Sequence, residues 1–136
     1  MKGYFYDHTR KLFANGEINV EDLRVILLRK HEAHLGDMSL ARIDRDEVSG
    51  NGWPFGGAQI KNCSIEISED DEATLRGEDI RVTAVAGSIG PTDSAVIAAE
   101  EFPLFFITFG EDKIASEGNS FIINWNWNGI MRWINP

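Results

Sequence analysis

Two histidines are close enough in the sequence to bind one metal ion together. His31 and His34 are three positions apart and would share one face of a helix, where imidazole pairs often bind zinc. A structural zinc site has four ligands, however, and neither an H-E-x-x-H motif nor a cysteine accompanies this pair. We therefore interpret both histidines as solvated side chains on a polar segment, and we predict no metal site.

Carboxylates are the most abundant ionisable side chains of this protein. The acidic run at residues 69–72 (EDDE) invites a calcium site, because hard cations prefer carboxylate oxygens. It lacks the D-x-D-x-D-G spacing of a calcium loop, so we expect a solvated turn instead. A glycosidase-type acid–base pair would place two carboxylates in contrasting surroundings, and no stretch isolates such a pair. We assign no catalytic residue and no cofactor, and we do not expect an enzyme.

A glycine-rich stretch at residues 49–57 (SGNGWPFGG) resembles a phosphate-binding loop only superficially. No Lys-Ser or Lys-Thr pair follows it, and it does not open a helix, so a phosphate site is not expected. The glycines exclude a long regular element and allow close backbone approach. We predict an ordered loop anchored by Trp53 and Phe55, which insert either into the core of the protein or into a neighbouring subunit.

The single cysteine, Cys63, cannot form an internal disulfide bond. The residues after it, Ser64 to Ile67, alternate between polar and apolar types as a strand does. A reactive thiol needs a nearby base and positive charge, whereas these surroundings are acidic. We therefore expect Cys63 to be a buried and inert thiol.

Aromatic and amide side chains alternate near the end of the chain, in residues 121–134 (FIINWNWNGIMRWI). Successive side chains of a strand point to opposite faces, so one face would be mostly aromatic and the other mostly amide. Asn128-Gly129 is a strong signal for a two-residue turn, because both residues tolerate positive φ. The chain is therefore predicted to end in a hairpin, with Met131 and Trp133 on the returning strand.

This hairpin has two interpretations. Indole rings stack on sugars and amides bond to hydroxyl groups, so Trp125, Trp127 and Trp133 could form a carbohydrate-binding module. Alternatively, the aromatic face packs into a core or an interface. The tryptophans share their face with Phe121 and Ile123, which favours core packing.

The remaining elements are predicted from apolar periodicity and from glycine and proline signals. Helical material is confined to the first third: a short helix within residues 3–15 that ends at Asn15-Gly16, and a second one, capped by Asp37 or Ser39, that runs to about residue 47. Strands are expected at residues 23–30, 58–68, 80–85, 95–99, 103–109 and 121–134, with a turn at residues 87–93 and a charged loop at residues 110–119. The run LFFITF is expected to be buried on both sides.

Short strands divided by such turns favour a single mainly β domain over residues 1–136. We predict an antiparallel β-sandwich, with the jelly roll as one form of it, and one or two short helices in the first third. A hydrophobic fraction of 43% and a charged fraction of 26% are ordinary for a globular domain of this length.

The net charge of −9 limits the partners of the protein. Binding to nucleic acid needs concentrated lysine and arginine, and adsorption to anionic lipid needs them too, so neither partner is expected. The first residues, MKGYFYDHTRKLF, carry charge throughout and do not form a signal peptide, and no apolar run is long enough to cross a bilayer. We expect a protein that stays in a cytosol-like compartment or is assembled there into something larger.

Short motifs run through the chain in a defined order. The sequence EVSGNGW at residues 47–53 is followed by Gly56-Gly57-Ala58. Further motifs are FANGEI at 13–18, Phe109-Gly110, the link at 116–118, and FIINW at 121–125, ending at Gly129-Ile130. Together they resemble a family of small virion proteins of tailed bacteriophages, whose signature reads E-V-S-G-x-G-Y-x-x-G-G-x-x-L. The resemblance spans most of the chain.

The resemblance implies a structural role in a virion, as a capsid decoration or cement protein on the outside of a phage head. Such proteins work as dimers or trimers, so the implied partners are the major capsid protein and further copies of the chain. A tail-associated or fibre-associated structural protein is the alternative. Apolar residues near both ends and in the glycine-rich loop are the expected contact residues: Tyr4, Phe5, Trp53, Phe55, Met131 and Trp133.

Overall fold

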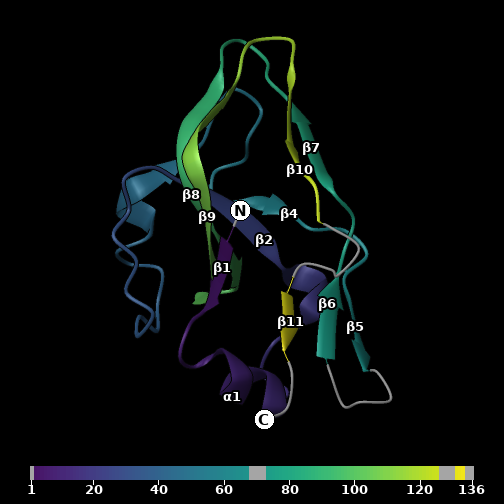
Figure 1. The fold of residues 1–136 in the computed structure, drawn as a ribbon. Helices are drawn as coiled ribbons and strands as arrows, with labels where there is room; N and C mark the ends of the chain where they lie inside the picture. Colours follow the sequence, from purple (N-terminus) through teal and green to yellow (C-terminus); the bar gives the residue numbers. More distant parts are fainter. Residues whose placement is uncertain (1, 68–72, 126–130, 134–136) are drawn as a thin grey trace.

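The computed structural model of the chain describes residues 2–67, 73–125 and 131–133 and is mainly antiparallel β (Figure 1). The main sheet has the strand order β1-β9-β8-β2-β3, with β4 pairing to β2 as its sixth strand. Its strands are β1 (Lys2–Phe5), β2 (Arg24–Leu28), β3 (Glu47–Val48), β4 (Ala58–Gln59), β8 (Ile89–Ala99) and β9 (Phe102–Ala115). The prediction of a mainly β fold with little helix is thereby confirmed.

The other strands form two smaller sheets. One pairs β7 (Ile80–Thr83) with β10 (Ser120–Ile123), and the other has the order β11-β6-β5, with β5 at Ser64–Ile67, β6 at Ala73–Arg76 and β11 at Met131–Trp133. In the part of the chain that the structure describes, helical structure is limited to α1 (Thr9–Ala14) and two 3₁₀ turns, η1 (Val20–Asp22) and η2 (Asp44–Asp46). No helix in the described ranges combines the length and the apolar character needed to span a membrane.

The central strands of the main sheet are buried on both faces. In β2, Val25 and Leu27 pack into one apolar cluster and Ile26 and Leu28 into another, as the alternation of a strand requires. The run LFFITF shows the same division, because Phe105 and Phe106 lie in opposite clusters. Its predicted burial on both sides is therefore correct.

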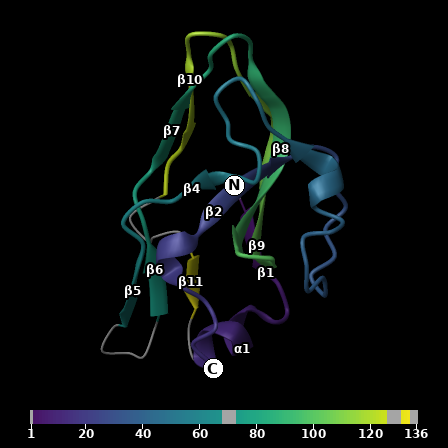
Figure 2. The same ribbon diagram turned by 180° about the vertical axis from the view of Figure 1, so that it is seen from behind.

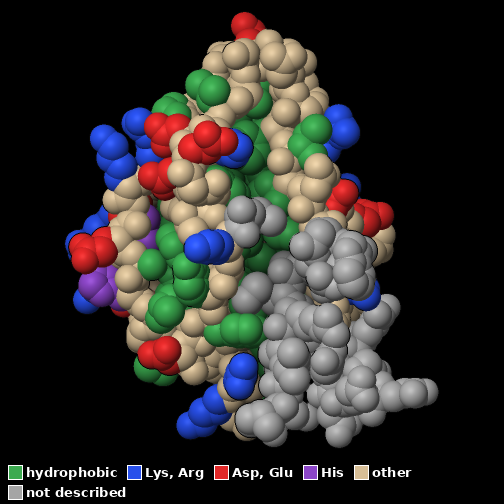
Figure 3. All heavy atoms as spheres, in the orientation of Figure 1, with side chains coloured by type: hydrophobic (Ala, Val, Ile, Leu, Met, Phe, Trp, Pro, Cys, Tyr) green, Lys and Arg blue, Asp and Glu red, His purple; other side chains and the backbone are tan. Residues whose placement is uncertain are grey.

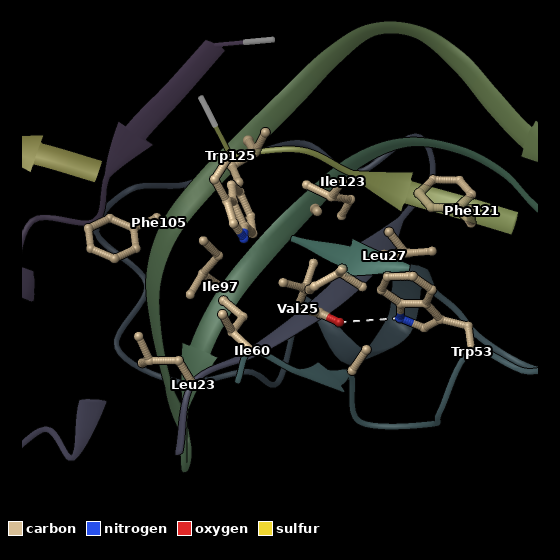
Figure 4. Packing of buried hydrophobic residues seen from close by; sticks show 14 of the residues in the cluster. Leu23, Val25, Leu27, Trp53, Ile60, Ile97, Phe105, Phe121, Ile123 and Trp125 are labelled. Carbon is tan, nitrogen blue, oxygen red and sulfur yellow. Dashed lines mark hydrogen bonds between the residues drawn. The ribbon is translucent and has the colours of Figure 1, made fainter. Parts of the chain in front are cut away.

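The larger cluster fills the space between the main sheet and the strands β6, β7 and β10 (Figures 2 and 4). Leu75 of β6, Ile80 of β7, and Phe121 and Ile123 of β10 face the side chains of β2, β8 and β9 there. The smaller cluster lies on the opposite face of the main sheet. The segment between β2 and β3 covers it with Leu40 and Ile43.

Two helix predictions need correction. Residues Lys2 to Phe5 form the edge strand β1, and α1 begins only at Thr9, although it ends at Asn15 as predicted. The register pairs Tyr4 with Phe106, so the apolar start of the chain gains more from extending the sheet than from a helix of its own. No α-helix follows Asp37 or Ser39. Only η2 forms there, and Leu40 and Ile43 pack onto the small cluster from this irregular segment.

Two predicted connections are in fact strand. β8 begins at Ile89, inside the predicted turn, and β9 continues to Ala115, inside the predicted loop. Irregular pairing between Ile89 and Ser94 allows this long hairpin to continue. Gly90 has a φ of +99°, and a Cβ there would lie 2.6 Å from the carbonyl oxygen of Lys113. Glycine is thus required where the two strands approach each other.

The predicted C-terminal hairpin is also wrong in its pairing. β10 pairs with β7, whereas β11 pairs with β6, so the two predicted hairpin strands belong to different sheets. The Asn128-Gly129 turn lies outside the described residues. The strand signal of residues 121–125 is nevertheless correct in its facing: Phe121, Ile123 and Trp125 are buried, and Ile122 and Asn124 are exposed.

Candidate functional site

Trp53 is the anchor of the glycine-rich loop. Its side chain is only 1% exposed, and its indole N–H donates to the carbonyl oxygen of Val25 at 3.3 Å (Figure 4). The ring also meets Phe121 edge to face at a centroid distance of 5.5 Å. Trp53 was predicted to insert either into the core of the protein or into a neighbouring subunit, and the structure places it in the core.

Phe55, the other predicted anchor, does not enter the core. It is 83% exposed, although it is only two residues from Trp53. The loop around it is held by other contacts: the Glu47 carboxylate accepts from the backbone N–H of Gly56 at 2.6 Å, and Arg24 donates to the carbonyl oxygen of Gly56 at 2.6 Å. The loop is therefore ordered, with Phe55 presented on the outside.

The predicted contact residues at the chain ends differ in position. Phe5 is half-buried and packs edge to face on Phe105 at 5.1 Å, so it belongs to the core of the chain. Tyr4 is 44% exposed and lines a shallow hollow of about 540 Å³ together with His31 and Phe106. Met131 and Trp133 lie on β11, and their side chains are outside the described residues.

The tryptophan proposed to stack on sugars is buried where it can be followed. Trp125 is 9% exposed, and its indole N–H donates to the carbonyl oxygen of Glu78 at 3.0 Å. Its ring therefore faces the core and leaves no free face for a sugar. Trp127 and the side chain of Trp133 lie outside the described residues.

The two histidines are not both solvated as predicted. His34 is exposed, but the side chain of His31 is only 2% exposed, and its Nδ1 lies 2.8 Å from a carboxylate oxygen of Asp46. The described residues contain no group of three or more His, Cys, Asp or Glu side chains placed to hold a metal ion. The acidic run at 69–72 lies outside the described residues.

Cys63 is half-buried just before β5, with its sulfur 3.6 Å from the carbonyl oxygen of Ile60. Burial raises the pKa of the Cys63 thiol from its ordinary value of 9.0 to about 11. The thiolate is the reactive form, so this direction agrees with the predicted inert thiol.

We expect iodoacetamide to alkylate Cys63 about 100-fold more slowly in the folded protein than in the urea-unfolded chain at about pH 8. The rate in the folded protein should climb with pH toward the raised pKa of about 11. Mass spectrometry of samples quenched over time measures both rates. Equal rates in the two states would contradict the argument.

One candidate for a binding site is a groove between β9 and β10 that is lined about equally by polar and apolar surface. We call it the edge groove; it measures about 420 Å³ and is lined by Phe109, Lys113, Ile114 and residues 120–124. Two isoleucines in it are unusually open to solvent: Ile114 is 59% exposed and Ile122 is 41% exposed. Figure 3 shows hydrophobic side chains along the hollow in the middle of this face.

Both walls of the edge groove are strand edges. β9 pairs with β1 only as far as Thr108, so residues 109–115 have β8 on one side and no described strand on the other. Among the described strands, β10 pairs only with β7. Figures 1 and 2 show the β7–β10 pair standing apart from the β8–β9 hairpin. Such edges expose backbone N–H and C=O groups to a possible partner strand.

None of the described residues that line the edge groove carries a carboxylate, although the chain has a net charge of −9. The one charged residue among them is Lys113, whose ammonium group lies 2.7 Å from a carboxylate oxygen of Glu111. The hydrogen bond and the charge of Lys113 lower the pKa of Glu111. The groove therefore combines exposed isoleucines with a nearly neutral charge balance on an acidic protein, a combination that suits protein contact.

Sequence reasoning did not select Ile114 or Ile122 as site residues. The sequence predicts that Ile122 lies on the amide face of its strand, and this position is the signal that could have selected it. Ile114 lies in a segment that the sequence predicts to be a loop. Comparison with known proteins adds no further candidates: no protein-family model, no curated protein and no solved structure matches the chain.

Proposed function

We propose that this protein is a structural component of a bacteriophage virion that decorates the capsid shell and stabilises it by multivalent contact. The observation that carries the proposal is the edge groove, where the exposed Ile114 and Ile122 lie beside strand edges that have no described partner strand. Exposed apolar patches of this kind mark protein–protein contacts. The ordered series of phage-like motifs supports the virion as the place where the contact is used.

The motif at residues 47–58 supports the proposal through the role that its residues have in the fold. Glu47 binds the backbone of Gly56, and Trp53 is buried against Val25 and Phe121. The motif therefore fastens the glycine-rich loop onto β2. Its spacing is a requirement of the fold, so proteins that share it are expected to share this architecture and to differ on their exposed surfaces.

For the finer architecture we propose a β-sandwich. The main sheet would be one layer, and the strands β5, β6, β7, β10 and β11 would supply the other. The continuous apolar cluster between them supports this arrangement, because it contains side chains from both sets of strands.

The proposed partners are the major capsid protein and further copies of the chain. A subunit of this size offers a modest interface to a shell, on the order of 800 Å² per partner. An oligomer raises the effective concentration of its second and third contacts, so a dimer or trimer stays attached where a monomer would dissociate. Among the predicted contact residues whose side chains the structure describes, Phe55 and Tyr4 are exposed and remain available for the shell.

The copy number in purified particles tests this function. We expect quantitative mass spectrometry to find on the order of hundreds of copies per virion, since multivalent decoration follows the many repeated subunits of a shell. A dozen copies or fewer would move the protein to the neck, tail or fibre. Absence from purified particles would contradict a virion role.

A further inference from the structure

We propose that the free edge of β10 pairs with the β10 edge of a second copy of this chain about a two-fold axis. The result would be a continuous antiparallel β7-β10-β10-β7 sheet across the dimer. This inference rests on the proposed function only in taking the protein to be an oligomer, and it adds the surface and the register of the contact.

The first argument concerns backbone groups. An antiparallel strand directs the N–H and C=O groups of alternate residues to opposite sides, so about half of those in β10 point away from β7. They border a groove whose walls include Phe109 and Ile114. A strand from a partner molecule would satisfy these backbone N–H and C=O groups one after another, as in a regular sheet.

The second argument concerns the side chains of this edge. Exposed edge strands are usually protected by lysine, proline or a bulge, which prevent pairing with other chains. Residues 120–124 read SFIIN and contain none of these, and their pairing with β7 is regular. Ile122 is 41% exposed at the centre of the strip. An unprotected, apolar edge is expected to be covered in the functional state.

The third argument is that this strip is complementary to itself. In an antiparallel pair centred on Ile122, the two Ile122 side chains lie opposite each other. Ser120 then faces Asn124 of the other copy, and Phe121 faces Ile123. Polar residues thus meet polar ones and apolar residues meet apolar ones, so a second copy fits without any change in register.

Charge supports the same occupant. Two copies that each carry a net charge of −9 repel one another over most of their surfaces, but the described residues that line the edge groove include no carboxylate. The residue of β7 that lies opposite Ile122 is the charged Arg81. In the proposed sheet the two Arg81 residues would be three strand spacings apart, about 14 Å, which exceeds the screening length of about 8 Å at physiological salt.

Site-directed cross-linking tests the register. In a Cys63→Ser background, Ile122→Cys is expected to oxidise readily to a disulfide-linked dimer, because directly opposite Cβ atoms in a sheet lie about 5 Å apart. Ser120→Cys alone should not cross-link, whereas an equal mixture of Ser120→Cys and Asn124→Cys should. Cross-linking of Ser120→Cys alone at the rate of Ile122→Cys would overturn the register.

Sedimentation equilibrium of the purified chain tests the surface itself. We expect the unmodified protein to dimerise, and Ile122→Lys to weaken the dimer by about 100-fold in Kd, because a charge would enter each half of the contact. Val85→Lys is the matched control: Val85 is 60% exposed, does not line the edge groove, and should leave Kd unchanged. Circular dichroism checks that both variants stay folded.

Three results would overturn the proposal. They are a protein that remains monomeric at its highest soluble concentration, a dimer that Ile122→Lys and Val85→Lys weaken equally, and a dimer with no cross-link through residue 122. A monomer that instead captures a strand from another protein would assign the groove to a different occupant. These measurements need no phage particles, so their result is independent of the copy-number test. The dimer proposal can fail while the virion role is supported, and the virion role can fail while the dimer is found.

Discussion

Trp53→Ala is expected to lower the free energy of unfolding by about 3–5 kcal/mol, the usual cost of removing a large aromatic side chain from a packed core. Trp53 is 1% exposed, donates to Val25 and packs edge to face on Phe121. Its loss leaves a cavity between the glycine-rich loop and β10, and it leaves the Val25 carbonyl without this donor. Urea denaturation followed by circular dichroism measures the change.

Phe55→Ala is the matched control for this experiment. It removes an aromatic ring from the same loop, but Phe55 is 83% exposed, so we expect a change within about 0.5 kcal/mol. If the two substitutions destabilised the protein equally, Trp53 would not be the anchor. Should Phe55→Ala keep full stability and reduce the occupancy of phage particles, Phe55 would be assigned to the shell contact.

Gly57→Ala is expected to cost about 3–5 kcal/mol of unfolding free energy, combining backbone strain with overpacking. Gly57 has a φ of +106°, and a Cβ there would lie 2.8 Å from the carbonyl oxygen of Val25 and 3.0 Å from a side-chain carbon of Ile26. Neither atom can move away easily, because both belong to β2 at the centre of the main sheet. The loop would have to shift outward instead.

The neighbouring Gly56→Ala separates the two contributions. Gly56 also has a positive φ, +87°, but a Cβ there would meet no atom within 4 Å. Only backbone strain remains, and we expect a loss of about 1–2 kcal/mol. Equal losses at the two glycines in urea denaturation would show that the close approach to β2 contributes nothing. A larger loss at Gly57 would confirm that this glycine of the motif serves packing.

These variants separate stability from binding in the proposed function. Trp53 and Gly57 hold the glycine-rich loop on the core, so their substitution should impair every function by unfolding the protein. Ile122 and Phe55 are exposed, so their substitution should change contacts while the free energy of unfolding stays nearly constant. A variant that loses particle binding is informative about the contact only when its stability is retained.

Local patterns in the sequence predicted the positions of β2, β7, β8, β9 and β10 and the facing of β10. They did not predict β1, β3 or β6, and residues 58–68, predicted as one strand, contain β4 and β5 in different sheets. The alternation of Phe121, Ile123 and Trp125 with Ile122 and Asn124 placed each side chain on its observed face, because a strand has a strict period of two. The continuous apolar run around Phe105 and Phe106 likewise predicted a strand buried on both sides. The end of α1 was marked by Asn15-Gly16. These features depend on the nearest neighbours along the chain.

The edge groove followed only from the tertiary structure. The alternation of side chains along a strand predicts which face of the strand is buried, but it does not predict which strand lies beside it. β10 in fact pairs with β7, and β11 pairs with β6. Strand pairing is decided by contacts between residues far apart in the sequence, such as Tyr4 with Phe106. Because the described part of β1 pairs with β9 only as far as Thr108, residues 109–115 have no described strand on the side that faces β10. The exposed Ile114 and Ile122 are candidate contact residues because they lie beside these two strand edges. No local pattern in the sequence predicts that arrangement.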